Sequence, residues 1–463
     1  MKILAWNLSM SKPDLISDET RLRKITFALT FIIFFSVLNG TTFQVAIPDI
    51  SSEYQLLPSE VSWVMTGYIL LFAVGSLIYG KLAGIYPVRN LITVGLILMS
   101  TGSLIGLMAT QYPILLFARI IQAAGGSAIP ALSMIVVTRY IQSSQRGRVL
   151  GIFASTVVLA AALGPVFGGF ISGTFHWRYL FLISMITIIA IPLLRKFLPD
   201  DDSYDSGFDL RGAVLISGGI ASLLIFVTMS GWWFLFSGVV MTIWFVFHIM
   251  KTDDPFVSPS LFMNHLFRNT VITTFLTIGT VFGMMFMVPI MLRELNGLES
   301  SRIGMAMFPG ALSAVIVGIP GGRLSDRKGS KFVFYLGSGL LVAGFLLLSI
   351  FAGMGTVIIS TTLIVCYSGF ALLQSSLPHA VSIELHKEQT GIGMGIYNLF
   401  FFISGALSTA VIGRLLDPGT AGFCVNPLNT CVRGWIYSNI FFLLAIVVTV
   451  AALIFYFTFR GRR

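Results

Sequence analysis

Long apolar segments follow one another along the chain and are separated by short polar stretches. Each segment runs to about 20 residues without the apolar–polar alternation of a β-strand, and a helix of that length crosses a hydrocarbon layer of roughly 30 Å. Backbone groups in hydrocarbon must be satisfied within the segment, which also favours helices. The pattern predicts an all-α membrane protein with fourteen transmembrane helices. The predicted spans are 25–48, 61–82, 90–109, 113–138, 149–173, 179–197, 212–229, 232–250, 270–292, 303–321, 332–352, 356–378, 392–415 and 435–459.

Composition and charge support this reading and orient the chain. Of the residues, 56% are hydrophobic and only 10% are charged, where a soluble domain has roughly a quarter charged. No cleavable signal peptide is evident, since the first 24 residues are largely polar and end in Arg21, Arg23 and Lys24. Fourteen crossings then place 23 of the 29 Lys and Arg residues on the inner side. We therefore expect a multi-pass protein of the cell membrane with both termini in the cytoplasm.

The formal charge of +10 does not require a nucleic-acid partner. Basic inner loops beside anionic membrane lipid account for it.

Two long polar breaks, at 195–211 and 251–269, divide the spans into six, two and six. This spacing predicts two helical bundles joined by a two-helix insert. The expected organisation is an N-terminal tail (1–24), a six-helix bundle (25–197), a linker with two extra helices (198–269), a second six-helix bundle (270–459) and a C-terminal tail (460–463).

An internal repeat agrees with this division. The second span of the first bundle is followed by GKLAGIYPVR at 80–89, and the second span of the last bundle by GRLSDRKGSK at 322–331. The two copies share a leading Gly, a Leu two residues later, a small residue next and a cation at the tenth position. Such a match is hard to obtain from composition alone.

The second copy resembles the G-x-L-x-D-R-x-G-x-[RK] loop of the major facilitator superfamily. Two further motifs agree: an R-x-x-Q helix at Arg119 and Gln122, and a G-P-x-x-G-G motif at 164–169 that marks exporters in this family. The resemblance covers essentially the whole chain. Together with VAIPDI at 45–50, it looks most like the fourteen-helix drug/proton antiporters, closest to the tetracycline exporters of Gram-positive bacteria.

The resemblance implies a major facilitator fold with two inserted helices, no cofactor, and a monomer that moves a small molecule by alternating access. It implies gating roles for the loop residues and for span 5, where missing side chains permit close helix approach and a bend. Lipid anchoring and ordinary small-residue packing are the structural alternatives. The candidate gating residues are Gly80, Arg89, Gly164, Pro165, Gly168, Gly169, Gly322, Asp326, Arg327, Gly329 and Lys331.

Arg119 is the one Lys, Arg, Asp, Glu or His residue that the spans place well inside the membrane. A lone cation in hydrocarbon is costly, so we expect it to face the bundle interior and to find a carbonyl, an amide or a bound anion. It either lines the substrate cavity or joins helices. The candidate substrate-binding residues are amides, hydroxyls, aromatics and this cation, which suit an apolar or amphipathic ligand. They are Asn39, Gln44, Trp63, Tyr68, Arg119, Gln122, Tyr397, Asn398 and Phe401.

Proton coupling is where the sequence departs from the family pattern. All nineteen Asp and Glu residues fall in predicted loops, tails or span edges, whereas proton-driven exporters generally need a membrane-embedded carboxylate. The five histidines also lie near span ends or in loops. Coupling could run through an edge acid such as Asp49 or Glu384, or through a titrating group on the substrate, or be absent.

The function predicted is proton-linked export of a drug-like or amphipathic small molecule. The alternatives are an uncoupled facilitator and a non-transporting membrane partner on a transporter fold. No metal constellation and no nucleophile with a base points to an enzyme. Cys424 and Cys431 flank an outer turn and either close a short disulfide loop or remain two thiols, while Cys366 is expected to be a packing residue.

Overall fold

The computed structural model describes residues 18–199, 209–252, 260–383, 385, 390–418 and 434–460. Within these residues the fold is helical without strands, and fourteen helical segments are long and apolar enough to cross a membrane, as predicted. Cys424, Cys431 and Glu384 lie outside the described residues, so the predictions that concern them have no structural counterpart here.

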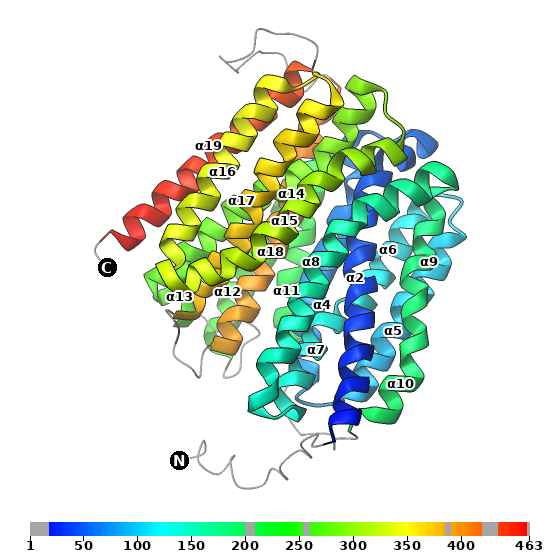
Figure 1. The fold of residues 1–463 in the computed structure, drawn as a ribbon, viewed down its shortest axis with the longest axis vertical. Helices are drawn as coiled ribbons and strands as arrows, with labels where there is room; N and C mark the ends of the chain where they lie inside the picture. Colours follow the sequence, from blue (N-terminus) through cyan, green and yellow to red (C-terminus); the bar gives the residue numbers. More distant parts are fainter. Residues whose placement is uncertain are drawn as a thin grey trace.

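The first six spans pack on one another and form one half of the molecule, at the right of Figure 1. The fourth span is two helices that meet at Ser127, and the sixth combines two α-helices with two 3-10 turns. These elements are α2 (Glu19–Tyr54), α3 (Pro58–Val61), α4 (Trp63–Leu82), α5 (Val88–Leu107), α6 (Tyr112–Gly126), α7 (Ala128–Tyr140), α8 (Ser143–Thr174), η1 (Trp177–Tyr179), α9 (Leu180–Met185), η2 (Ile186–Ile189) and α10 (Ala190–Phe197).

The last six spans form the other half, at the left of Figure 1. Its elements are α13 (Ser260–Met263), α14 (His265–Asn296), α15 (Ser300–Lys328), α16 (Ser330–Phe351), α17 (Thr356–Ile383), α18 (Thr390–Leu416) and α19 (Trp435–Phe459).

The two helices between the halves, α11 (Leu210–Met229) and α12 (Trp232–Lys251), pack on each other. Only α11 of this pair packs closely on α4 and α18, one helix from each half, and the Trp63 indole donates to Thr228 Oγ1 at 3.1 Å. Helix α12 presents large apolar side chains outward, with Trp233 84% exposed. Such a face suits hydrocarbon rather than water.

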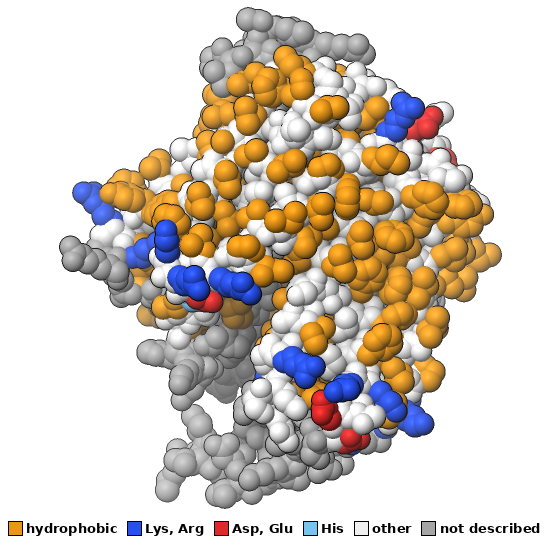
Figure 2. Space-filling view, viewed as in Figure 1, with side chains coloured by type: hydrophobic (Ala, Val, Ile, Leu, Met, Phe, Trp, Pro, Cys, Tyr) orange, Lys and Arg blue, Asp and Glu red, His pale blue; other side chains and the backbone are white. Residues whose placement is uncertain are grey.

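The molecule has two ends of different character. The basic end is the end at which α2 begins and α4 stops, and it carries exposed cations such as Arg23, Arg148 and Arg327. Figure 2 shows Lys and Arg side chains along the margin of a broad apolar surface on this side. The closed end is the opposite one, where α8 packs on α15 and α3 packs on α18.

Helix α2 is longer than the predicted span. The sequence pattern places the end of the first span at Pro48, whereas the helix continues through this proline to Tyr54. A proline in a helix removes one hydrogen bond but does not always stop the helix when neighbouring helices support it. Asp49 and Glu53 consequently lie within α2.

Candidate functional site

Arg119 is the centre of a polar cluster inside the first half. It is 1% exposed, and its guanidinium lies between two rings, 4.1 Å from the Phe43 centroid and 4.0 Å from the Tyr68 centroid. Nε donates to the Val64 carbonyl oxygen at 3.2 Å, and Nη1 donates to Gln122 Oε1 at 2.6 Å. A carbonyl, an amide and two aromatic faces thus replace water around this cation. Within the described part of the chain, no carboxylate forms an ion pair with it.

Gln122 extends this cluster across four helices. Its Nε2 donates to Ser184 Oγ at 2.8 Å, to Ser103 Oγ at 2.9 Å and to Asn39 Oδ1 at 3.4 Å. The two serine hydroxyls are 2.7 Å apart. Because both ends of the Gln122 amide are engaged, the amide fixes the direction in which Arg119 points. The cluster unites Arg119, Gln122, Asn39 and Tyr68 from the predicted set.

An aromatic series leads from this cluster into the second half. Tyr68 stacks on Phe72 with ring centroids 5.8 Å apart, and Phe72 lies 5.3 Å from Phe402 of α18. Phe402 is 5.2 Å from Phe401, which is 6.3 Å from Tyr397. The series connects the buried cation to two further predicted residues.

The remaining predicted binding residues lie apart from the Arg119 cluster. Gln44 is buried and donates to Met285 Sδ of α14 at 3.7 Å, which joins the two halves. Trp63 contacts the insert, and Asn398 is exposed on α18. Gln44 and Trp63 thus lie in two separate contacts, and Asn398 lies at an exposed position.

A charged cluster joins the halves at the closed end. The Asp49 carboxylate on α2 accepts from Arg293 of α14, from Ser300 of α15 and from Ser172 of α8. Arg293 also donates to Ser300 Oγ at 3.0 Å. The Asp49 and Arg293 side chains are 24% and 34% exposed, so water screens the pair only in part. Four helices, two from each half, therefore meet at one carboxylate.

A second carboxylate bridges the halves at the same end. Asp417 is 2% exposed, accepts from the Ser59 backbone N–H at 3.0 Å and pairs with Arg414 at 2.9 Å. Ser59 belongs to α3, and the other two residues lie at the end of α18. The closed end is thus held by charge-assisted hydrogen bonds at two places.

Glycines of α8 permit the close approach of helices at this end. A Cβ at Gly164 would overlap the Thr41 side chain, and one at Gly168 would overlap the Thr42 backbone, so α8 lies directly against α2. On the opposite face, a Cβ at Gly169 would lie 2.6 Å from the Ser300 carbonyl oxygen, and one at Gly304 would overlap the Pro165 carbonyl oxygen. The G-P-x-x-G-G motif forms the seam between the halves.

We expect Gly304→Leu to prevent the closed end from forming. The new side chain would meet backbone atoms of Pro165, which cannot move aside as a flexible side chain can. Overpacking of this kind costs about 1–3 kcal/mol, enough to shift a two-state equilibrium by about fivefold or more. The measurement is the distance between spin labels across the closed end. The matched control is Gly339→Leu on α16, where a Cβ meets open space. Equal label distances in the two variants would show that close packing at Gly304 does not hold the closed end together.

The repeated loops lie at the basic end, where α4 and α15 stop. Asp326 and Arg327 are exposed, and within the described residues Asp326 forms no ion pair. Lys331 contacts the Phe459 carbonyl oxygen at 3.4 Å, and Arg89 contacts the Arg195 carbonyl oxygen at 3.4 Å, each within its own half. Gly80 and Gly322 border open space, and Gly329 has φ +83° at the end of α15.

Several residues of these clusters carry no signal in the sequence. Ser103 and Ser184 resemble other serines of apolar helices, and Phe43 resembles many phenylalanines of the chain. Arg293 stands 244 positions from Asp49. The sequence does show that Asp49 and Arg293 stand near span ends of opposite halves, but this position does not specify that the two residues pair.

The chain matches the Major Facilitator Superfamily over residues 29–409. It is 27% identical over 430 residues to the multidrug transporter protein MdtP of Bacillus subtilis, covering 89% of this chain and 79% of that protein. It is 29% identical over 395 residues to the riboflavin transporter RibZ of Clostridioides difficile, covering 82% of this chain and 84% of that protein.

Solved structures share the fold at low identity. A bacterial homologue of the human lysosomal transporter Spinster, in an inward-facing and unoccupied conformation, has a TM-score of 0.69 and 14% identity, over 96% of this chain and 98% of that one. A peptide transporter, POT, in complex with sulfate has a TM-score of 0.69 and 15% identity, over 95% of this chain and 94% of that one.

Proposed function

The chain belongs to the major facilitator superfamily, and we propose that it exports a drug-like or amphipathic small molecule by proton-linked alternating access. The observation that carries the proposal is the set of charged contacts that join the halves at the closed end. Asp49, Asp417 and the seam at Gly304 hold the halves together at one end. At the other end, Asp326 of the repeated loop is exposed. This is the arrangement expected of a carrier open toward its basic end.

The proposed orientation follows from charge. Because basic loops stay on the cytoplasmic side, the basic end faces the cytoplasm, with both chain termini. The structure then corresponds to a state that takes up substrate from inside the cell. The gating roles proposed for the glycines of α8 and for the loop at 322–331 follow from the same cycle.

The substrate class is proposed from the side chains around Arg119. A buried cation, amides and an aromatic series that spans both halves suit a planar or amphipathic molecule with a few hydrogen-bonding groups. MdtP is a multidrug transporter and RibZ a riboflavin transporter. Both descriptions agree with such a molecule, and no nucleic acid or second chain is needed to complete the proposed cycle.

Proton linkage is assigned to Asp49. Its carboxylate forms the bridge between the halves only while it is ionised, because a protonated carboxyl is a poor partner for Arg293. Protonation would therefore weaken the closed end and favour the alternate state. This gives the proton a differential affinity for the two states, which is the requirement for coupling.

The test is transport in everted membrane vesicles. The panel contains tetracycline, a cationic dye and riboflavin, each with and without an imposed pH gradient. We expect one or more of them to accumulate only when the gradient is present, and Asp49→Asn to lose the dependence on the gradient.

Uncoupled facilitation is the second candidate. It is favoured by the absence of any Asp or Glu at the middle of a described span. Flux that is identical with and without the gradient would replace the proposed mechanism by this one.

A further inference from the structure

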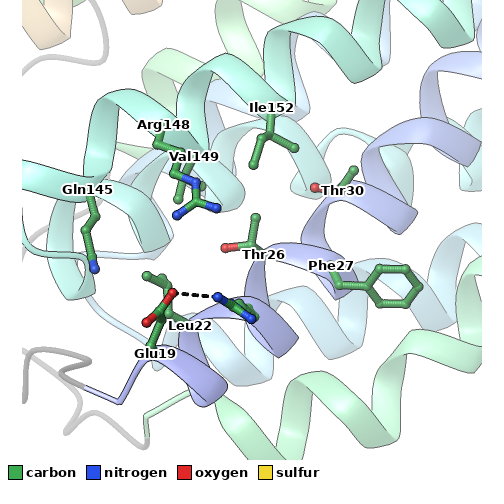
Figure 3. Close-up of a pocket in the computed structure, with 10 residues that line it drawn as sticks. Glu19, Leu22, Thr26, Phe27, Thr30, Gln145, Arg148, Val149 and Ile152 are labelled. Atoms are coloured by element: carbon green, nitrogen blue, oxygen red, sulfur yellow. Dashed lines mark hydrogen bonds and ion pairs between the residues drawn. The ribbon is translucent and has the colours of Figure 1, made fainter.

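A pocket of about 280 Å³ lies at the basic end between the first turns of α2 and α8, apart from the Arg119 cluster. Figure 3 shows the Arg148 guanidinium in it, extending from α8 toward Thr26 of α2, while Phe27 points away. Leu22, Val149 and Ile152 supply its apolar walls. Cationic, hydroxyl and apolar groups therefore meet in one recess.

The hydroxyls in this pocket are unusual for helix residues. Threonines in helices commonly donate to a carbonyl oxygen of the preceding turn, as Thr41 and Thr156 do. Thr26 and Thr30, one turn apart, have buried hydroxyl oxygens with no hydrogen-bond partner among the described residues. Thr26 is only 9% exposed. A buried hydroxyl without a partner is unfavourable, and both line the same recess.

Arg148 is the pocket cation that no acidic side chain of the pocket neutralises. Glu19 pairs with Arg23 at 2.8 Å, so these two charges offset each other. Arg148 has no ion pair or hydrogen bond within the described part of the chain. The pocket is therefore suited to an anion, and an unpaired guanidinium with two free hydroxyls matches the oxygens of a phosphate group.

The apolar surface around the pocket favours a lipid over other anions. Phe27 and Ile152 line the pocket and are 66% and 38% exposed, so apolar surface borders the recess. Figure 2 shows the margin between basic and apolar side chains on this face. The volume of about 280 Å³ is at the lower limit of the roughly 300–1,000 Å³ of pockets that hold a drug-sized ligand. A head group would fit inside, with its acyl chains outside against the apolar surface.

We propose that this pocket binds the phosphate of an anionic phospholipid, through Arg148, Thr26 and Thr30. The site ties α2 to α8, the two helices of this half that meet the other half at Asp49 and at the Gly304 seam. Bound lipid would thus stabilise the position of α8 on α2.

The test uses the full-length protein purified in a non-ionic detergent, with lipid binding followed by native mass spectrometry and by thermal unfolding. The probes are phosphatidylglycerol, phosphatidylcholine and inorganic phosphate. We expect phosphatidylglycerol to bind and to raise the unfolding temperature. Arg148→Gln and Thr26→Val should each weaken that binding by about tenfold.

Thr26→Val separates a lipid site from a structural role. It removes an unpaired buried hydroxyl at nearly constant volume, so it should raise the unfolding temperature without lipid and reduce the increase that lipid produces. Arg268→Gln is the matched control, because Arg268 is an exposed cation of α14 at the same end of the molecule.

The alternative outcomes overturn the proposal. Equal weakening by Arg268→Gln would mean that lipid binds by diffuse charge attraction. Equal binding of inorganic phosphate or phosphatidylcholine would remove the assignment to an anionic lipid. Since binding is measured without transport, the result is independent of the substrate and of proton linkage.

Discussion

Arg119→Ala should lower transport per folded molecule by more than about tenfold and destabilise the protein by about 2–4 kcal/mol. The substitution leaves Gln122 Oε1 without its donor and removes the cation from between Phe43 and Tyr68. Relief of the desolvation cost of the buried charge offsets part of this loss. Transport of the most active compound of the vesicle panel and thermal unfolding in detergent, measured on the same preparations, check both numbers.

Arg119→Lys is the matched control because it keeps the charge. One ammonium group cannot donate to Val64 and Gln122 in the fork geometry of a guanidinium, nor present a flat face to both rings. We expect an intermediate loss of both stability and transport. Unchanged transport by the folded fraction of Arg119→Ala would instead reduce Arg119 to a residue that joins helices.

The fold could be predicted from the sequence because the hydrophobic signal is local. Fourteen apolar runs predict fourteen spans without knowledge of any contact between them. Most Lys and Arg residues fall in every second loop, which distinguishes the two ends of the molecule. Arg119 and Gln122 could be singled out for the same reason, since a cation stands out against apolar neighbours. The structure adds the partners of Arg119, because Phe43, Tyr68 and Val64 come from other helices.

The closed end could not be predicted in this way. A proline inside an apolar run is read as a boundary, so Asp49 falls one position beyond the predicted first span, whereas α2 continues to Tyr54. Its partner Arg293 stands at the end of another predicted span. A pairing between residues 244 positions apart depends on how two halves dock, which no local pattern encodes.

Asp49→Asn should destabilise the state in which the halves are joined at the closed end. We expect the equilibrium constant between this state and the alternate state to change by about fivefold to 150-fold, which corresponds to a coupling of about 1–3 kcal/mol. The carboxamide places an N–H₂ group among the donors Arg293, Ser172 and Ser300, and leaves Arg293 without an ion pair. Distances between spin labels at Leu57 and Met354 report on the closed end, and labels at Tyr86 and Phe332 on the basic end. All four side chains are exposed. The labels go into a background without native cysteines.

A double variant tests the ion pair itself. Exchanging the pair, as Asp49→Arg with Arg293→Asp, should restore part of the closed population. If Asp49→Asn leaves both distance distributions unchanged, the carboxylate does not control the closed end, and proton linkage must be sought in the substrate or abandoned for facilitation.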